Sequence, residues 1–374
     1  MKNRALFSLG ISVLLGAFSA QAQFSITPLS GFGTTGAGWL APNTVDGSTY
    51  TYLTTGTTER GLAVGDGDLF LVSRNGGNNV RILNPLTGAD IGSLNTSGMS
   101  GGTFAENMVA VGGDGTVYVG NLTTSATTPF TVYAWTPGNF SSAPTVVYSG
   151  NPLGGGTRLG DDLAAIGSGA STMLVGGYGA GSSGYQIINV PSVSLNAGTT
   201  AAVSFTGSPP NAGDFRLGIT FTDSSHVIGT QGSTLYRYSS FSGSTGTLLA
   251  SPPLASSAER PLAYAVVGSH DLMAAISTGD NHVSVYDMTD PTNPVLLGQA
   301  NATTGTLPAN ANATGDVAWG NILSNPDGSG SADLYAMSTA DGIQAFLVVI
   351  PEPGALSLMA LGLGGLAFWR RLRK

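Results

Sequence analysis

Charged side chains are scarce in this sequence, and most of those that could do chemistry recur at one position of a repeating pattern. Only 9% of the 374 residues are charged, far below the roughly 25% of an average soluble domain. Charged residues stand just before six small apolar segments: Glu59 and Arg60, Glu106, Asp161 and Asp162, Arg216, Glu259 and Arg260, and Asp316. If they converge, carboxylates and guanidinium groups could hold a polar ligand or a metal, or support hydrolysis with a divalent cation.

Five of these residues form the candidate ligand site: Arg60, Glu106, Asp162, Arg216 and Asp316. In a ring of repeats, equivalent positions converge on one face near the axis, and a set that carries both signs of charge suits a polar ligand. The alternative is that the same side chains solvate the mouth of a channel and pair with one another. No catalytic residue is predicted from the sequence.

Metal-binding patterns are weak. Four oxygen-bearing residues alternate in one segment: Asn325, Asp327, Ser329 and Asp333. They resemble a calcium loop, but no glutamate follows at its twelfth position, so a polar hairpin turn is the favoured interpretation. Three histidines stand in different repeats: His226, His270 and His282. Nothing in their spacing brings them together on zinc, and cysteine is absent. No cofactor or metal site is therefore predicted, with Ca²⁺ in that loop as the weak alternative.

The elements that must position these charges are short strands in a repeating order. Periods of about 40 to 55 residues are typical of propeller blades. A small apolar strand, a second apolar strand, an alternating strand and a weaker fourth strand recur along the chain, and turns of Gly, Asp or Ser precede the second strands. The predicted second strands are Asp68–Ser73, Thr116–Gly120, Thr172–Gly176, Ser225–Gly229, Asp271–Ala275 and Asp333–Met337.

The sixth repeat lacks a fourth strand, because Val349 runs directly into the C-terminal segment. Residues Thr49–Thr54, just before the first repeat, could supply it, which would close the ring and remove exposed strand edges. We therefore predict an all-β fold, a six-bladed β-propeller closed by an N-terminal strand. Residues 23–43 leave a seven-bladed alternative open.

One repeat carries a resemblance to a known family. The segment Asp68–Leu94, with SRNGGNNV at residues 73–80 and LTG at residues 86–88, resembles a YVTN-type propeller repeat. The resemblance covers about one blade well and the others loosely. It supports the fold, but such propellers include both enzymes and scaffolds, so it implies no activity.

The N-terminus has the three parts of a secretory signal peptide. Lys2 and Arg4 are followed by the apolar stretch Leu6–Phe18, and Ala20 and Ala22 place small residues at the cleavage positions. We predict a signal peptide over residues 1–22, with cleavage after Ala22. The alternative, a short uncleaved anchor, is disfavoured because the apolar stretch is too short to span a bilayer comfortably.

The C-terminus carries a second signal. Pro351, Glu352 and Pro353 precede the apolar run Gly354–Trp369, and a basic cluster ends the chain. This order resembles the PEP-CTERM sorting signal, which implies recognition by exosortase, a membrane cysteine transpeptidase of bacteria that usually make exopolysaccharide and biofilm. We predict a β-propeller domain over residues 23–349 and a sorting signal with a transmembrane helix over residues 350–374. A plain C-terminal membrane anchor is the alternative.

The charge of the predicted body limits its partners. Residues 23–349 carry seven arginines, no lysine and twenty acidic residues, a net charge of −13. Such a surface repels nucleic acid. We predict an exported protein, anchored transiently in the inner membrane and then located at the cell surface or outside the cell. We expect a non-catalytic role in a matrix, in adhesion or with exopolysaccharide; the alternative is a lactonase-like propeller hydrolase or lyase.

Overall fold

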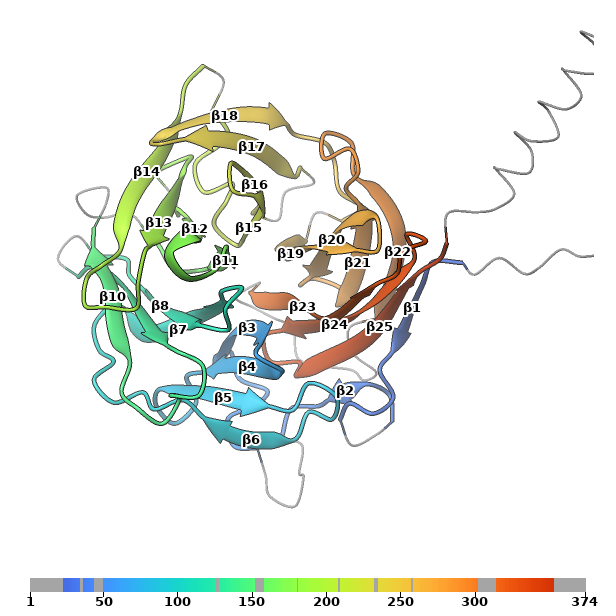
Figure 1. Cartoon of the computed structure of the whole chain (residues 1–374), viewed down its shortest axis with the longest axis horizontal. Helices are drawn as coiled ribbons and strands as arrows, with labels where there is room; N and C mark the ends of the chain where they lie inside the picture. Colours follow the sequence, from blue (N-terminus) through green and yellow to red (C-terminus); the bar gives the residue numbers. More distant parts are fainter. Residues whose placement is uncertain are drawn as a thin grey trace, which may run out of the picture.

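The computed structural model describes residues 23–352, with gaps at residues 34–35, 44–49, 126–127, 152–157, 180, 208, 232–234, 257 and 302–313. Figure 1 shows antiparallel strands grouped around a central axis, each group running from an inner strand to an outer one. The predicted all-β propeller is therefore confirmed. The predicted signal peptide and the predicted C-terminal helix lie outside the described residues.

The first five blades each contain four antiparallel strands that follow one another in the chain. Blade 1 contains β3 (Glu59–Gly65), β4 (Asp68–Ser73), β5 (Asn79–Leu83) and β6 (Asp90–Ser93). Blade 2 contains β7 (Phe104–Val111), β8 (Val117–Leu122), β9 (Phe130–Trp135) and β10 (Thr145–Gly150). Blade 3 contains β11 (Ala164–Ile166), β12 (Thr172–Gly177), β13 (Tyr185–Val190) and β14 (Thr199–Phe205), with the short 3-10 helix η1 (Gly169–Ser171) between β11 and β12.

The second half of the ring repeats this arrangement. Blade 4 contains β15 (Gly218–Asp223), β16 (His226–Thr230), β17 (Arg237–Ser242) and β18 (Thr245–Ala250). Blade 5 contains β19 (Glu259–Val267), β20 (His270–Ser277), β21 (His282–Asp287) and β22 (Val295–Asn301). Blade 6 contains β23 (Gly315–Ser324), β24 (Gly330–Ser338) and β25 (Ile343–Ile350), together with β1 (Ser25–Pro28) and β2 (Trp39–Leu40).

Two neighbouring blades share one hydrogen-bonded sheet. The outer strands β14 and β18 pair in parallel, with Ser204 opposite Thr245 and Phe205 opposite Gly246. The sheets of the described residues therefore number five, one of them eight-stranded, rather than the six separate sheets that the repeats predicted. The reason is that β14 continues past Val203, where its pairing with β13 ends, so its last residues reach the edge of β18.

The last blade joins the two ends of the described chain. Strand β1 lies antiparallel to β25, with Ser25 opposite Val349 and Pro28 opposite Phe346. Figure 1 shows β1 (blue) beside β25 (red). Because β1 and β2 both pair with β25, residues 23–43 complete this blade, and the seven-bladed alternative is wrong. Closure by an N-terminal strand is confirmed.

The prediction that Thr49–Thr54 forms the closing strand is wrong. Within Thr49–Thr54, residue 49 lies outside the described residues, and residues 50–54 form a turn and a bend with irregular ends rather than a strand. The edge of β25 is occupied by β1 and β2, so no place on that strand remains for this segment. Tyr50, Tyr52 and Leu53 are instead buried between blades 6 and 1, in a cluster that includes Ile343. Their apolar character serves packing rather than strand pairing.

Hydrophobic side chains fill the spaces between blades. The described residues form six hydrophobic clusters, and each lies between two adjacent blades. In one of them, Phe70 and Val72 of blade 1 pack with Val117 and Val119 of blade 2, and all four side chains are fully buried. Burial of each such side chain contributes about 1.5–3 kcal/mol. These layers hold the blades in a ring and fix the inner strands around the axis.

Two glycines allow the inner strands to approach one another closely. A Cβ atom at Gly218 would lie 1.6 Å from the carbonyl oxygen of Arg260, and one at Gly61 would lie 2.5 Å from the backbone nitrogen of Val109. Only glycine fits such positions, because it has no Cβ. The inner strands of adjacent blades therefore touch, and the residues that begin them meet on one face of the ring.

Candidate functional site

The inner strands of all six blades surround a central channel. A cavity of about 260 Å³ between them is lined by residues of β3, β7, β15, β19 and β23 and by residues in and just before β11. Where these strands begin, a second cavity of about 440 Å³ opens, which we call the channel-mouth cavity. Its lining residues are Thr57, Arg60, Arg74, Phe104, Asn107, Leu122, Arg158, Asp161, Arg216 and Thr314. The volume is within the range of about 300–1,000 Å³ that is typical of small-molecule sites.

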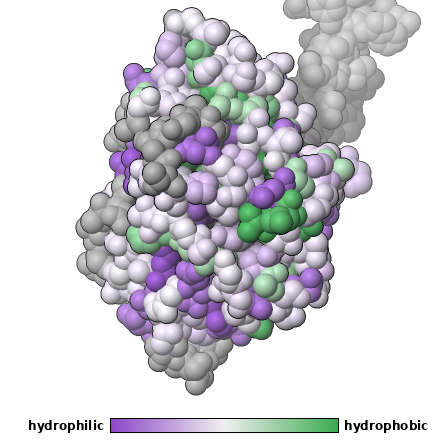
Figure 2. All heavy atoms as spheres, turned by 90° about the vertical axis from the view of Figure 1, so that its left-hand side faces the viewer, coloured by the Kyte–Doolittle hydropathy of each residue, from purple (hydrophilic) through white to green (hydrophobic). Residues whose placement is uncertain are grey.

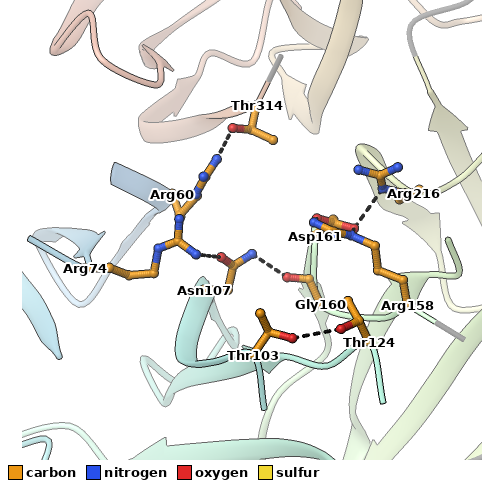
Figure 3. Close-up of polar contacts among 10 residues, drawn as sticks. All are labelled: Arg60, Arg74, Thr103, Asn107, Thr124, Arg158, Gly160, Asp161, Arg216 and Thr314. Atoms are coloured by element: carbon orange, nitrogen blue, oxygen red, sulfur yellow. Dashed lines mark hydrogen bonds and ion pairs between the residues drawn. The ribbon is translucent and has the colours of Figure 1, made fainter. Parts of the chain in front are cut away.

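Two arginines of blade 1, Arg60 and Arg74, line one side of the channel-mouth cavity (Figure 3). Their Nη2 atoms both donate to the carbonyl oxygen of Thr57, at 2.9 Å from Arg60 and 3.2 Å from Arg74. Nη1 of Arg60 donates to Oγ1 of Thr314, and Nη1 of Arg74 donates to Oδ1 of Asn107 at 3.3 Å. Both guanidinium groups are therefore held in place by neutral acceptors.

The same two arginines are crowded and only partly satisfied. Burial, reinforced by the charge of Arg60, lowers the pKa of Arg74 to about 10, and burial also lowers the pKa of Arg60. Their Nε atoms are buried and have no hydrogen-bond partner among the described residues. The guanidinium of Arg74 lies over the ring of Phe104, with 3.5 Å between its carbon and the ring centroid. The two positively charged guanidinium groups thus lie in the same desolvated region, and no carboxylate of a described residue lies between them.

A carboxylate joins two arginines elsewhere in the cavity. Arg158 donates from Nε and Nη2 to Asp161, at 2.5 and 2.6 Å, and Arg216 donates from Nε to the same carboxylate at 2.8 Å. Figure 3 shows Asp161 between these two side chains, facing Arg60 and Arg74 across the opening. Bidentate pairs of this kind fix the geometry of the guanidinium group. Asp161 therefore positions two arginines but can balance the charge of only one.

The cavity as a whole is cationic. Four arginines and one aspartate among its ten lining residues give a formal charge of +3, although residues 23–349 carry −13 in total. These four make up most of the seven arginines in that part of the chain. A positive cavity in a low-dielectric wall concentrates anions at its surface. The arrangement can bind an anion, whereas it is unsuited to a cation.

Two of the predicted site residues, Asp162 and Asp316, act as clasps between blades. Oδ2 of Asp162 accepts the N–H of Ile219 at 2.5 Å, which links the start of blade 3 to blade 4. Oδ2 of Asp316 accepts the N–H of Leu62 at 2.7 Å, which links blade 6 to blade 1. In each case the second oxygen accepts the N–H of the next residue in the chain.

Both clasp residues are almost fully buried. Burial raises the pKa of Asp162 and of Asp316, and the neighbouring charge of Asp162 raises that of Asp316 further. Both carboxyl groups line the channel cavity rather than the channel-mouth cavity. Their oxygens are already occupied by backbone groups, so their evident role is to hold the inner strands together.

Glu106 lies apart from the other predicted residues. It lines a third cavity of about 360 Å³, which it shares with Arg74 and Phe104. Its Oε1 accepts the N–H of Asn79 at 2.5 Å, and burial raises the pKa of the carboxyl group to about 8. Glu106 is therefore mostly uncharged at neutral pH and does little to balance the arginines.

The predicted site residues thus occupy three places. Arg60 and Arg216 line the channel-mouth cavity, Asp162 and Asp316 line the channel, and Glu106 lines the third cavity. The structure brings the two arginines into one cavity but does not place the three carboxyl groups beside them.

Sequence reasoning missed several members of the channel-mouth cavity, and three of them matter most for its charge and geometry. They are Arg74, Arg158 and Asn107. Asn107 bridges the two sides, because its Nδ2 donates to the carbonyl oxygen of Gly160 at 2.6 Å. The signal that could have found the arginines is their rarity, since residues 23–349 contain only seven.

The calcium-loop pattern forms an ordinary turn between β23 and β24. Oδ1 of Asp327 accepts the N–H and the hydroxyl of Ser329, at 2.8 and 2.6 Å, and Asn325 Nδ2 donates to the same hydroxyl at 2.9 Å. Asp333 is engaged elsewhere, by the amide of Asn321. Within the described ranges, no three His, Asp or Glu side chains come together as a group that could hold a metal ion.

Each histidine is paired with its own aspartate, but His270 and His282 begin neighbouring strands of blade 5, so the three histidines do not stand in different repeats as predicted. The pairs are His226 with Asp223, His270 with Asp287, and His282 with Asp280. The structure does not gather the histidines into one site. In the part of residues 23–352 that the structure covers, no helix has the length and apolar character needed to cross a membrane.

Comparison with known proteins bears on the fold and on the C-terminus separately. The chain is similar to a DUF4623 family protein from Bacteroides eggerthii, with 17% identity and a TM-score of 0.58 over 80% of this chain and 72% of that one. It is also similar to a triple arginine-to-alanine mutant of AofleA from Arthrobotrys oligospora, with 10% identity and a TM-score of 0.50 over 82% and 89% of the two chains. At such identities the likeness concerns the fold alone.

A third similar structure is the periplasmic gluconolactonase PpgL of Pseudomonas aeruginosa, with 14% identity and a TM-score of 0.42 over 78% of this chain and 86% of that one. No curated protein matches the sequence. Residues 349–374, however, match the PEP-CTERM protein-sorting motif. The chain therefore carries a PEP-CTERM motif behind a β-propeller body, which indicates export, transient membrane anchoring and processing by exosortase.

Proposed function

We propose that this protein is a non-catalytic component of the envelope or extracellular matrix that associates with polysaccharide. The channel-mouth cavity is the observation that carries the proposal, because its polar side chains are held in place by their neighbours and still line an opening of about 440 Å³. The binding residues that we propose are Arg60, Arg74, Arg158 and Arg216. A pre-positioned set of hydrogen-bond donors favours binding, because little conformational entropy is lost when the ligand arrives.

The sorting motif supports the proposed location. It begins at residue 349, within the last two residues of β25, so the tail directly follows the closing blade. We propose that exosortase cuts the chain near Pro351, Glu352 and Pro353, after a signal peptide of residues 1–22 has been removed. The body of residues 23–349 then leaves the inner membrane for the cell surface or the surrounding matrix.

The outer surface is compatible with that location. Figure 2 shows the side of the ring opposite blade 6 dominated by near-neutral and hydrophilic residues, with hydrophobic residues gathered in small patches. The outermost strands of blades 1 and 5 also carry few exposed apolar side chains, namely Ile91 on β6 and the adjacent Val295 and Leu296 on β22. Scattered exposed apolar residues are normal on a soluble surface.

Nothing in the described site favours a lactonase-like hydrolase over this proposal. General acid–base catalysis needs a carboxyl or imidazole group that can reach the ligand. Asp162 and Asp316 use their oxygens on backbone N–H groups, and Asp161 is held by two arginines. The groups that remain directed at the cavity are guanidinium groups, which bind anions rather than exchange protons.

The test measures where the full-length protein is located in a bacterium that makes exosortase and exopolysaccharide. An epitope inserted after Gly243 reports the location of the protein, because a Cβ atom at Gly243, in the turn between β17 and β18, would meet nothing within 4 Å beyond its chain neighbours. We expect the epitope in the surface or matrix fraction with exosortase present, and in the inner membrane without it. Recovery from matrix in amounts that do not change when the polysaccharide is absent would contradict the association with polysaccharide.

A further inference from the structure

We infer that the channel-mouth cavity recognises an acidic sugar, a monosaccharide unit that bears a carboxylate or a sulfate group. This inference rests on the proposed association with polysaccharide and adds the chemical class of the ligand. The acidic group would lie between the two pairs of arginines, Arg60 with Arg74 and Arg158 with Arg216.

The first argument is the distribution of charge. Four of the seven arginines in residues 23–349 line one cavity, while that part of the chain contains no lysine and carries −13 in total. Like charges placed together in a desolvated cavity repel one another, so the arrangement is costly unless an anion joins them. An oxyanion in the cavity would replace this repulsion with charge-assisted hydrogen bonds.

The second argument is the set of donors left without acceptors. Arg60 is only 7% exposed, and its Nε has no hydrogen-bond partner among the described residues; the buried Nε of Arg74 has none either. Arg216 uses Nε on Asp161, and no hydrogen bond to a described residue engages its two Nη atoms. Guanidinium groups present planar forks of N–H donors that match the oxygens of a carboxylate or a sulfate.

The third argument is that the protein's own acids do not neutralise these donors. Asp161 is shared between Arg158 and Arg216. Oε1 of Glu59 accepts the N–H of Thr54 at 2.8 Å, and burial raises the pKa of that carboxyl group. Glu106 is turned toward Asn79 and is mostly uncharged at neutral pH. The cavity therefore keeps its positive charge at neutral pH.

The size of the cavity and the charge of the rest of the body narrow the class of anion. About 440 Å³ admits a small ligand rather than a folded chain, and Phe104, whose side chain is 41% exposed, adds apolar surface that can face the carbon skeleton of a sugar ring. A body that carries −13 repels densely charged polymers. A single acidic sugar in an otherwise neutral polysaccharide satisfies both conditions.

The experiment is isothermal titration calorimetry of the full chain in mild detergent. The probes are glucuronic acid, galactose 6-sulfate and inorganic sulfate, with glucose and galactose as the neutral counterparts. The variants are Arg74→Gln and Arg216→Gln, one from each pair. Arg81→Gln is the matched control, because Arg81 pairs with Asp90 in blade 1 and lies outside the channel-mouth cavity. Arg74→Lys and Arg216→Lys keep the charge but lose the planar fork, and thermal melts establish that every variant is folded.

We expect an acidic sugar to bind at least tenfold more tightly than its neutral counterpart. Arg74→Gln and Arg216→Gln should each lose tenfold or more in affinity for the acidic sugar, whereas the control Arg81→Gln should not. The lysine variants should recover part of the loss. Glucuronic acid and the sulfated sugar separate carboxylate from sulfate recognition, and tighter binding of inorganic sulfate than of both sugars would overturn the assignment to a sugar.

Equal binding of neutral and acidic sugars would overturn the inference but leave the association with polysaccharide standing. Binding of acidic sugars that survives both Arg→Gln variants would also overturn it, because the recognition would lie elsewhere. Absence of binding to every sugar, with matrix association intact in the epitope experiment, would refute this cavity as the contact. Absence of both would refute the proposed function itself.

Discussion

Replacing Glu106 with glutamine is expected to flatten the pH dependence of stability. The side chain is fully buried, Oε1 accepts the N–H of Asn79 at 2.5 Å, and Oε2 has no hydrogen-bond partner among the described residues. Burial raises the pKa of the carboxyl group from its usual 4.5 to about 8, although the N–H of Asn79 and the charge of Arg74 act in the opposite direction. Glutamine keeps the acceptor and removes the titration.

The magnitude follows from the difference in pKa between the two states. Between its unfolded pKa of 4.5 and its folded pKa of about 8, the Glu106 carboxyl keeps its proton in the folded state and loses it in the unfolded state. The free energy of unfolding therefore falls as the pH rises through this window. The slope is about 1.4 kcal/mol per pH unit midway between the two pKa values and smaller near each of them, so the contribution of Glu106 falls by roughly 3.5 kcal/mol between pH 5 and pH 8. For a domain of this size, that free-energy change corresponds to about 5 °C in Tm.

Thermal melts followed by circular dichroism at pH 5, 6, 7 and 8 measure the effect. Relative to the wild type, Glu106→Gln should gain Tm steadily from pH 5 to pH 8. Asp327→Asn is the control, because it removes the same formal charge from an exposed turn where hydrogen bonds from Ser329 lower the pKa of the carboxyl group. The Asp327→Asn variant must leave the slope of Tm against pH unchanged between pH 5 and pH 8. A Glu106→Gln profile parallel to that of the wild type would show that the buried carboxyl does not retain its proton, and the reasoning would fail.

Three further changes test the construction of the ring. Asp316→Ala removes the acceptor that links blade 6 to blade 1 and leaves the buried N–H of Leu62 unsatisfied. Urea titration should therefore show a loss of about 1–3 kcal/mol in the free energy of unfolding. An unchanged urea midpoint would contradict the clasp role of Asp316. Deleting Ser25–Pro28 exposes the edge of β25, so light scattering should reveal association of copies, and a monodisperse monomer would refute this. Gly218→Ala places a Cβ against the carbonyl oxygen of Arg260 and should lower Tm by several degrees, whereas a neutral effect would argue against the close approach.

Local patterns made most of the strands predictable. The expected second strand Asp68–Ser73 is β4 with the same bounds, and the expected second strand Thr172–Gly176 is β12, which ends one residue later at Gly177. Apolar alternation and turn residues are local properties, so they can be read from neighbouring positions. The closing strand is different, because four residues near the N-terminus carry little pattern of their own, and their partner in β25 lies at the far end of the chain.

The residues of the candidate site also fall into those that local sequence patterns predict and those that only tertiary packing brings together. Arg60 and Arg216 stand where inner strands begin, Arg60 as the second residue of β3 and Arg216 just before β15, and this repeated position made them visible in the sequence. Arg74 follows β4, and Arg158 lies in the loop before blade 3, so only the packing of different blades brings them into one cavity. The clasp role of Asp162 was equally hidden, since the backbone group that it binds belongs to the next blade.

The pairing of β1 with β25 also sets an order of events. A chain made from its N-terminus can complete blades 1 to 5 one after another, because the strands within each blade are consecutive. Ser25 must wait for Val349 before the last blade can form, and contacts between residues so distant in sequence are slow to form. The ring therefore closes only after β25 has been synthesised, and a chain that stops before Ile343 leaves β1 without the strand that it pairs with.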